Sequence, residues 1–581
     1  MLDLYDYLNI AFYFLFVIGV GVVFSRRNRN TSDYFRSGGV LPWWMTGASA
    51  WMASFSAWTF TGAAGKMYTS GPYVLGLYYS ALVPLLLLML AVSHRFRRMR
   101  VVTPLEAVRL RYGASAQQFF AWMRLPLMLL LGGVALNALG VFMATLFNVP
   151  LPVVIVVSGL AMTLLSLLGG AFGVAAGDFV QLLLVVIVSG AVAACALALP
   201  DIGGWSGLWR QAPPAHHDLS SLARTELIVA WILALAVTKL FESASMDASA
   251  KFLMARNERH ARLSVVIPLI GTLLGPLLWL VPPTVAAIRH PDLATLFPAL
   301  KFPAEAAFLV TAREVLPSGM LGLLVCGIFA ATLTTLYASV NQLAGIFVRN
   351  YYLPVLRPDA DEQRLLAVSK VVSGVLGCLV IALGLLVNGL CRLNLFDLLN
   401  QLAASLAVPL AVPLTFGLFF KRTPSWSSWS TVLVGLGCSL AVRLLFLPEM
   451  LDGRFGLRGP FLPEEVTQLN LIATVTVVTA ASTAWFFFTS LFYRRSTPAY
   501  QAAVEAFFDR LRTPLGETRP GERPEDPGVA LPVGRLCLIY GVFIALFAGI
   551  PNPASGRFCF LACGAVMGGV GGLLTLRRRT R

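Results

Sequence analysis

The stretch GASAWMASFSAWTFTGAAG, residues 47–65, lies within a long apolar run but consists mainly of Gly, Ala, Ser, Thr and aromatic residues. A second stretch, TKLFESASMDAS at 238–249, interrupts another apolar run with hydroxyl-bearing and charged residues. Gly loses more backbone freedom in a helix than Ala does, and Ser and Thr compete for the backbone hydrogen bonds. Both stretches therefore predict helices that are interrupted within an apolar environment.

Each interrupted stretch opens a block of five apolar runs, and the blocks cover residues 44–199 and 225–420. Because five is an odd number, the second block must enter a membrane inverted relative to the first. An inverted five-plus-five repeat with broken first helices is typical of secondary transporters, in which half-helix ends and freed carbonyl groups bind ions near the midplane. The alternative is close helix packing, since small residues let backbones approach and Ser or Thr can hydrogen-bond to their own helix.

The composition requires lipid as the solvent and predicts an all-α polytopic membrane protein. The chain has 581 residues, of which 57% are hydrophobic and 12% are charged, and its mean hydropathy is +0.76. Soluble domains carry about 25% charged residues. A bilayer core needs roughly 20 apolar residues per helix, and fifteen such runs are present, at 5–25, 44–66, 73–93, 118–147, 151–170, 175–199, 225–248, 263–288, 315–347, 365–389, 395–420, 427–447, 467–492, 533–551 and 557–576.

Basic residues lie mainly between the apolar runs and on one predicted side of the membrane. Cytoplasmic loops are enriched in Lys and Arg, so we expect the N-terminus outside, the C-terminus inside and a location in the cell (inner) membrane. The net charge of +16 then reflects topology rather than nucleic-acid binding. Seven loops on the predicted inner side hold 29 of the 44 Lys and Arg residues, namely 26–43, 94–117, 250–262, 349–364, 421–422, 494–532 and 577–581.

Outside the two five-run blocks, the chain divides into an extra N-terminal helix, a peripheral helix pair, a linker and a two-helix tail. The linker contains PLGETRPGERPEDPG, whose Pro, Gly and charged residues predict a flexible cytoplasmic segment. The expected segments are 1–30, repeat A at 44–199, repeat B at 225–420, the peripheral pair at 427–493, the linker at 494–532 and the tail at 533–581.

The usual signals of an enzyme are absent from the sequence. The eight cysteines lie in or beside apolar runs, without a CxxC pair or a Cys/His cluster of metal-ligand spacing, and predict small hydrophobic residues in helices. The apolar runs contain no grouping of a nucleophile with a base. We therefore expect no enzymatic activity and no cofactor.

Ionisable groups within predicted spans are costly and usually face a cavity, and five of them are candidates of this kind, Asp178, Lys239, Glu242, Asp247 and Asp397. For Asp178 and Asp247, which lie near helix ends, an interfacial position is the alternative. Lys239 and Glu242 are three residues apart on one helix and can neutralise each other. Asp397 is near the outer end of its span, so an ordinary solvated carboxylate is the alternative there.

Five motifs resemble those of the sodium:solute symporters, a family with the LeuT-type fold. The resemblance covers roughly residues 30–420 well, and the five motifs occur in the family's order and at its expected spacing. They are SDYFRSGGVLPWWMTGASAWMASFSAWTFTGAAGKMYTSG at 32–71, VTPLEAVRLRYG at 102–113, LLGGAFGVAAGDFVQ at 167–181, AKFLMARNERHAR at 250–262 and PLAVPLTFGLFFKRT at 409–423.

The resemblance implies a sodium site between the first and eighth helices of the ten-helix core. The family's Ala-x-x-Ser-Ser pattern corresponds to Ala331, Thr334 and Thr335 in GIFAATLTTLYASV, residues 327–340. Hydroxyls three and four residues beyond a carbonyl share one helical face, and Thr keeps the hydroxyl although both family serines are replaced. The opposing ligands implied are the backbone carbonyls of Met52 and Phe55.

The resemblance also places Asp178 at the family's acidic residue along the sodium exit path. We interpret this carboxylate as an electrostatic attractant for sodium rather than as a direct ligand.

Solute contacts are implied by similarity to the bacterial sodium/galactose transporter, but the pattern departs from it. A carboxylate, an amide donor and a lysine of the sugar site are lost, the gate tyrosine corresponds to Phe241, and a Gln-Arg pair corresponds to Ala250-Lys251. A sugar bound in the galactose manner is therefore disfavoured. The aligned positions are Ser54, Thr59, Tyr78, Ala81, Thr238, Thr272, Asp397 and Asn400, and the cavity we expect is framed by Tyr78, Phe241, Glu242, Asp397, Asn400 and Gln401.

We therefore expect a sodium-coupled secondary symporter that imports a small polar organic solute, bearing a hydroxyl or amino group, by alternating access. Sodium, the solute and the lipid bilayer are the expected partners, and nucleic acid is not. Glu242 and Asp397 leave open a proton-coupled or sodium-independent transporter on the same fold. A transporter-like solute sensor is a further alternative, although such proteins usually carry an added signalling domain. The solute, the stoichiometry and the oligomeric state do not follow from the sequence.

Overall fold

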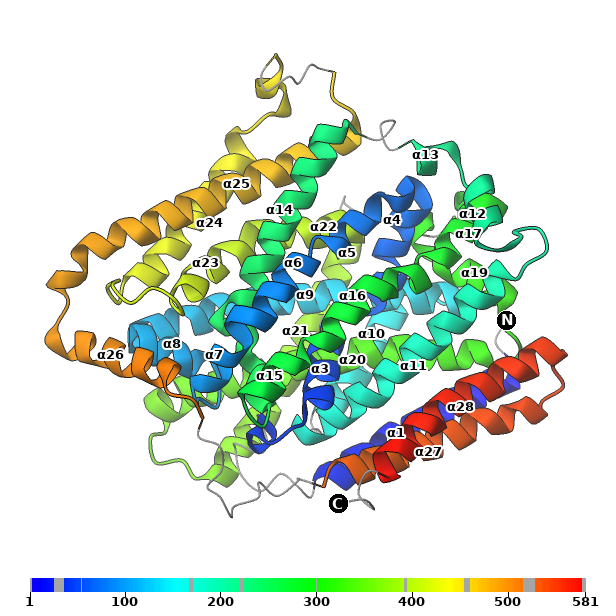
Figure 1. Ribbon diagram of the computed structural model, residues 1–581, viewed down its shortest axis with the longest axis horizontal. Helices are drawn as coiled ribbons and strands as arrows, with labels where there is room; N and C mark the ends of the chain where they lie inside the picture. The colour runs from blue at the N-terminus through cyan, green and yellow to red at the C-terminus, as the bar shows by residue number, and fades with distance from the viewer. Residues whose placement is uncertain are drawn as a thin grey trace.

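Helices make up the regular structure of the described chain. The computed structural model describes residues 3–25, 36–53, 55–166, 171–218, 223–298, 300–390, 394–453, 460–515 and 528–576. Within these residues there is no strand, only an isolated bridge between Leu41 and Ala255. The long helices pack side by side in one bundle (Figure 1).

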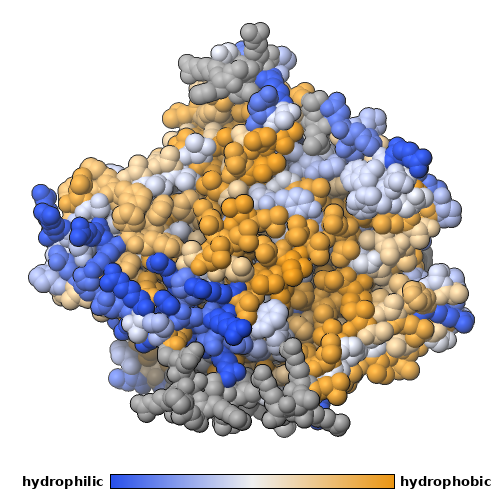
Figure 2. All heavy atoms as spheres, viewed as in Figure 1, coloured by the Kyte–Doolittle hydropathy of each residue, from blue (hydrophilic) through white to orange (hydrophobic). Residues whose placement is uncertain are grey.

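Eleven helical segments of the described chain are long and apolar enough to cross a membrane, and shorter apolar helices lie at Leu4–Val20, Leu151–Leu164 and Met320–Leu333. Many large apolar side chains on the outside are exposed (Figure 2). Such extensive apolar surface is not stable against water. The predicted class, an all-helical membrane protein, therefore fits. The count of fifteen spans and the orientation of the termini stay predictions.

The first predicted interruption is present. Helix α3, Trp43–Met52, ends before a non-helical segment, and the chain resumes in the 3-10 helix η2, Ala57–Phe60, and in α4, Gly62–Ser70. Figure 1 shows α3 near the lower edge of the bundle and α4 near the opposite end. The two halves therefore meet inside the bundle, where the backbone between them lacks helical hydrogen bonds.

The chain reverses after α4 at Gly71, whose φ of 58° is a conformation that favours glycine. It returns across the bundle through α5–α7 and then builds the rest of the first block. These helices are α5 Leu75–Tyr79, α6 Leu82–Leu87, the π-helix Leu88–Val92, α7 Ser93–Arg98, α8 Pro104–Tyr112, α9 Ala114–Phe147, α10 Leu151–Ser166 and α11 Ala171–Leu197.

The second interruption begins later than the sequence predicts. Helix α14, Thr225–Ala244, is continuous through the first half of the 238–249 stretch, and the break comes at Ser245, whose φ and ψ are −71° and 150°. Helix propensity and burial of the apolar face evidently outweigh the polar residues up to Ala244. The block continues with η6 Met246–Ala250, α15 Glu258–Ser264, α16 Val266–Trp279, α17 Val281–Arg289, η8 Pro303–Ala306, α19 Ala307–Val315, α20 Met320–Phe347, α21 Glu362–Leu390, α22 Leu395–Leu402 and α23 Val408–Phe416.

Helices outside these blocks include a peripheral pair and a group of three formed by the two ends of the chain. Helices α24, Ser427–Leu445, and α25, Pro463–Thr489, pack against each other and against α23. Helix α1, Leu4–Ser25, packs against α27, Ala530–Leu546, where the rings of Phe12 and Phe543 stack, and α27 packs against α28, Ala554–Leu576 (Figure 1). Asp6 Oδ1 accepts a hydrogen bond of 2.7 Å from Gly322 N, which fixes α1 to the start of α20.

The linker prediction is wrong for residues 498–512, which form α26, Pro498–Arg512. Its side chains at 504, 507, 508 and 511 make an apolar stripe of helical spacing, and all four are buried against α7 and α8. Arg111 Nη1 also donates to Tyr500 Oη over 2.9 Å. The Pro- and Gly-rich part, 516–527, lies outside the described residues.

Candidate functional site

Three backbone carbonyl oxygens surround the hydroxyl of Thr335 on α20. Thr335 Oγ1 lies 3.0 Å from Met52 O, 3.4 Å from Phe55 O and 3.0 Å from Ala331 O. Four of the five residues expected at the sodium site are thus together. The side chain of the fifth, Thr334, is outside the described part of the structure. A hydroxyl has only one proton to donate, so it cannot satisfy three carbonyls at once.

Thr332, one turn earlier on α20, holds the other side of the interruption. Its Oγ1 accepts a 2.8 Å hydrogen bond from Ala57 N and donates over 3.0 Å to Ile328 O. Ala57 opens η2, so its amide has lost the partner that a continuous helix would supply. The sequence motif did not predict this role. The only available signal was that residues 332 and 335 share one helical face.

Asp178 is buried in α11 and forms a polar cluster with Ser49 of α3 and with Lys251. Ser49 Oγ of α3 donates to Asp178 Oδ2, and Lys251 Nζ lies 3.6 Å from the same oxygen. Lys251 Nζ also donates to Ser49 Oγ over 2.8 Å. Only 2% of Asp178 is exposed, so it is not a solvated carboxylate, and the interfacial position stays an alternative. Asp247, the other candidate of this kind, pairs with Arg124 of α9.

Four aromatic residues cluster at the interruption, around the ring of Trp279. The ring of Trp279 on α16 lies 5.2 Å from that of Phe55, 6.0 Å from Trp51 and 6.1 Å from Tyr78 on α5. Thr59 is buried in η2 beside them. The Tyr78 hydroxyl and the Trp279 Nε1 group are buried and make no hydrogen bond of good geometry among the described residues, although the Tyr78 hydroxyl interacts with Thr59 and Trp279. Orphaned polar groups of this kind are rare in a core and suit a polar ligand.

The candidates on α22 are partly satisfied by their own helix, and Asp397 lies near Lys66 and Glu464. Asn394 Nδ2 donates to Asp397 Oδ2 and Asp397 N donates to Asn394 Oδ1, both over 2.9 Å. Asn400 Nδ2 donates over 3.1 Å to Phe396 O, and Gln401 is half-buried.

The candidates on α14 have partners elsewhere. Thr238 Oγ1 donates to Ala234 O over 3.0 Å. Phe241 packs against Phe416, 5.7 Å between centroids, in an apolar cluster separate from the Tyr78 group. Lys239 Nζ lies 2.8 Å from Glu242 Oε2, so the self-neutralising pair is formed. Of the other aligned positions, Ala81 and Thr272 are half-buried, and Ser54 lies outside the described residues.

Comparison with known sequences identifies the family of the chain. Residues 34–435 match the family model described as the Sodium:solute symporter family. The chain belongs to the sodium:solute symporter family. The resemblance predicted from the motifs is thereby confirmed, and the family is one of transporters rather than enzymes.

The relatives of this symporter-family chain include proteins for two kinds of solute. It is 25% identical over 523 residues to the sodium/glucose cotransporter of Vibrio parahaemolyticus, covering 83% of this chain and 91% of that protein. It is 24% identical over 451 residues to the sodium/sialic acid symporter of Proteus mirabilis, covering 73% and 86%. Sodium-coupled transport follows for the family, but the solute of this member does not.

The fold also matches a solved structure, described as the substrate-bound outward-open state of a Na⁺-coupled sialic acid symporter. The TM-score is 0.66 at 19% identity, with 84% of this chain and 98% of that chain covered. This match supports the LeuT-like transporter fold predicted above.

No group of three or more His, Cys, Asp or Glu side chains in the described part of this symporter could hold a metal ion. The oxygen atoms around Thr335 are of another kind. Neutral hydroxyl and carbonyl oxygens can replace the hydration shell of a small monovalent cation.

Proposed function

We propose that this chain imports a small polar organic solute together with sodium by alternating access, as a multi-pass protein of the cell (inner) membrane. Family membership supports the coupling to sodium. The observation that carries the proposal for this chain is the convergence of Met52 O, Phe55 O and Ala331 O on the Thr335 hydroxyl.

Sodium would bind between α20 and the end of α3. Its oxygen ligands would be the hydroxyl of Thr335 and the three carbonyls, with Thr334 as a further ligand implied by the family motif. When the ion binds, the Thr335 proton turns away and its lone pairs face the cation, since a hydroxyl both donates and accepts. The oxygens are neutral, so Asp178 would supply long-range attraction along the exit path.

The solute would bind on the aromatic side of the interruption. The Tyr78 hydroxyl, the Trp279 Nε1 group and Thr59 form a buried polar group without a hydrogen bond of good geometry for Tyr78 or Trp279, and they offer hydrogen bonds to a solute. The rings of Trp51 and Phe55 would pack against the apolar face of the solute. Asp397, Asn400 and Gln401 would complete the site from α22. Thr238, Phe241 and Glu242 are weaker candidates because each already has a partner on α14 or α23.

Phe55 gives a direct physical link between the two sites. Its carbonyl lies at Thr335 while its ring lies 5.2 Å from that of Trp279. An ion that fixes the backbone at Phe55 therefore also fixes the ring that would contact the solute. Coupling of this kind is reciprocal, so sodium and solute should tighten each other's binding by the same factor.

The test uses purified full-length protein and thermal unfolding. Sodium chloride is compared with potassium chloride at equal ionic strength, and a panel of sugars, sialic acids, amino acids, polyols and vitamins is then added in each salt. We expect stabilisation by sodium alone and a larger solute effect in sodium than in potassium. Equal curves in the two salts, with solute binding that ignores sodium, would refute the proposal and favour the proton-coupled alternative.

A further inference from the structure

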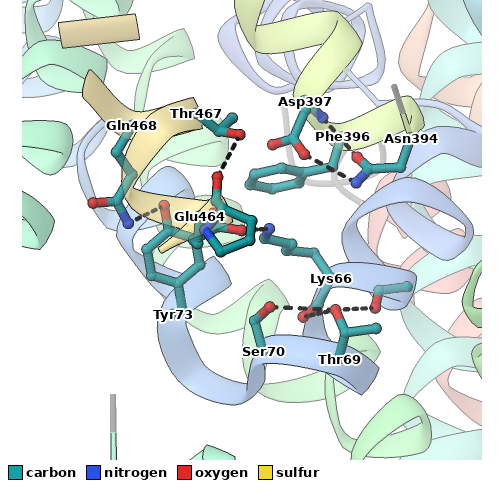
Figure 3. A network of polar contacts seen from close by, with 12 residues as sticks. Lys66, Thr69, Ser70, Tyr73, Asn394, Phe396, Asp397, Glu464, Thr467 and Gln468 are labelled. Atoms are coloured by element: carbon teal, nitrogen blue, oxygen red, sulfur yellow. Dashed lines mark hydrogen bonds and ion pairs between the residues drawn. The ribbon is translucent and has the colours of Figure 1, made fainter. Parts of the chain in front are cut away.

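A buried ion pair lies at the end of the bundle opposite the basic loops. Lys66 Nζ of α4 lies 2.6 Å from Glu464 Oε2 in the first turn of α25, with 6% and 19% of the two side chains exposed (Figure 3). Helix α4 is the second half of the interrupted helix, whereas α25 lies outside the two repeats. With the predicted orientation, this end faces the outside of the cell.

Aromatic rings enclose the Lys66 ammonium. It lies 5.5 Å from the ring centroid of Tyr73 and 5.7 Å from that of Phe396 on α22. The Tyr73 ring stacks on Trp231 at 4.3 Å, and its hydroxyl accepts a 2.9 Å hydrogen bond from Gln468 Nε2. Gln468 is one turn after Glu464. One face of α25 therefore contacts the segment 66–73 twice, through a charge pair and through an amide.

An ion pair such as Lys66–Glu464 suits a contact that must separate and re-form. Burying a Lys and a Glu costs desolvation, and apolar residues of similar size would often stabilise a permanent contact at least as well. A separated apolar contact would expose its surface to water. In contrast, a separated ion pair regains the hydration of both charges, so opening is less costly for the pair. Asp397 offers a second carboxylate on the other side of the Phe396 ring (Figure 3).

We propose that Lys66 and Glu464 form an ion-pair closure of the outer pathway, which separates to let the solute reach the site beside Tyr78. The closure rests on the proposed function, because only a transporter needs this pathway to open. Both are positioning residues, since they act by holding α4 against α25. The pair also gives α25, which is not part of the repeats, a role in the transport cycle.

The neighbouring residue Glu465 provides a matched control. Its carboxylate lies 3.4 Å from Arg224 Nε and accepts a hydrogen bond from Leu462 N over 3.0 Å. It is as close to the end of α25 as Glu464 is, but its partners Arg224 and Leu462 directly precede α14 and α25 and are not on the interrupted helix. A general loss of stability at this helix end should therefore follow from either substitution, whereas opening should follow only from the loss of Glu464.

The experiment places a reporter cysteine at Ser70, which is 4% exposed and lies one turn after Lys66. Ser70→Cys is made alone and together with Glu464→Gln, Glu465→Gln, Glu464→Asp and the exchange Lys66→Glu/Glu464→Lys. Each protein is treated from the outside with a membrane-impermeant cationic methanethiosulfonate, with sodium or potassium present. The chain with Ser70 intact measures background labelling of the native cysteines.

We expect Glu464→Gln to raise the labelling rate about tenfold, the effect of a tenfold shift toward the open state. Glu465→Gln should label like the parent, Glu464→Asp should be intermediate, and the exchanged pair should return toward the parent rate. In the proposed cycle sodium stabilises the outward-open state, so sodium should speed labelling of the parent but not of Glu464→Gln, which is already open. Equal rates for Glu464→Gln and Glu465→Gln, or no recovery in the exchanged pair, would overturn the closure.

Failure of the closure and failure of the proposed function can be told apart. If sodium stabilises the wild-type protein while the labelling rates of the two glutamate variants coincide, the closure is wrong and the symporter proposal stands. If sodium has no effect on wild-type unfolding, the symporter proposal fails, and the comparison in potassium still tests the closure.

Discussion

The hydroxyl of Thr335 and the carbonyl oxygen of Met52 lie 3.0 Å apart, although 283 residues separate them in the chain. This contact joins α20 to the end of α3 at the point where the helical hydrogen bonds of α3 stop. The carbonyls freed by the interruption therefore point at a side chain that can share them with a cation. This relationship connects the broken helix to the threonine motif, and the proposed coupling to sodium rests on it.

Substitution of Thr335 tests that relationship. Thr335→Val keeps the shape of the side chain but removes the hydroxyl, so we expect the sodium concentration for half-maximal thermal stabilisation to rise at least about tenfold, or about 1.4 kcal/mol. Thr335→Ser should keep most of the response. Thr431→Val on α24 is the control, because its hydroxyl also donates to the carbonyl four residues earlier, Ser427 O. An unchanged sodium response in Thr335→Val would remove this residue from the site.

Thr332 has a structural role that can be separated from sodium binding. Thr332→Val leaves the buried Ala57 amide without its 2.8 Å acceptor, and we expect a loss of about 1–3 kcal/mol of stability in potassium. Thr332→Ser should restore the acceptor. Thr145→Val on α9, whose hydroxyl bonds only within its helix in the described contacts, should cost less. Equal melting temperatures for the two valine variants would show that the Ala57 contact does not contribute.

Local sequence predicted the interruption at 47–65, because small and hydroxyl-bearing residues weaken a helix wherever they lie. It could not predict which atoms fill the gap. The partner of Ala57 is 275 residues away, and that of Lys66 is 398 residues away. Lys66 itself ends a predicted span, where an ordinary interfacial lysine is the simpler interpretation, and only the packing of α4 on α25 gives it a buried partner.

The α14 candidates show the limit of alignment to a family pattern. Thr238 corresponds to a solute contact and Phe241 to the gate tyrosine, and Glu242 was expected to frame the cavity. However, α14 continues to Ala244 and each of the three residues finds a partner nearby. Residue type alone does not fix the direction of a side chain, since one residue turns a helix by about 100°. Helix α26 was missed for a different reason. Its four apolar residues are spaced for one helical face, but the segment around them is mostly polar.

Lys251 should control how strongly Asp178 attracts sodium. Lys251→Gln removes the ammonium that lies 3.6 Å from the buried carboxylate. Since breaking a buried pair typically costs about 3–5 kcal/mol, stability in potassium should fall. The uncompensated charge should at the same time lower the sodium concentration needed for half-maximal stabilisation. The control is Lys239→Gln, which breaks the half-exposed pair with Glu242. The same sodium response in both variants would mean that Asp178 does not act on the ion.

Glu305 should make stability depend on pH near neutrality. Its carboxylate is 5% exposed, and Oε1 accepts a 3.0 Å hydrogen bond from Leu395 N at the start of α22. Burial raises the pKa of Glu305 from 4.5 to about 7, although the Leu395 hydrogen bond opposes this shift. Between these two values the folded chain keeps a proton that the unfolded chain has lost.

Raising the pH from 4.5 to 7 should therefore destabilise the fold through Glu305, by at most about 1.4 kcal/mol per pH unit, and the effect should level off above pH 7. Glu305→Gln carries no charge at any pH, so its advantage over the wild type should grow through this window. Melting temperatures at pH 5, 6, 7 and 8, with the exposed Glu449→Gln as control, measure the difference. A constant offset between Glu305→Gln and the wild type across this range would mean that Glu305 ionises as an ordinary carboxylate in the folded protein.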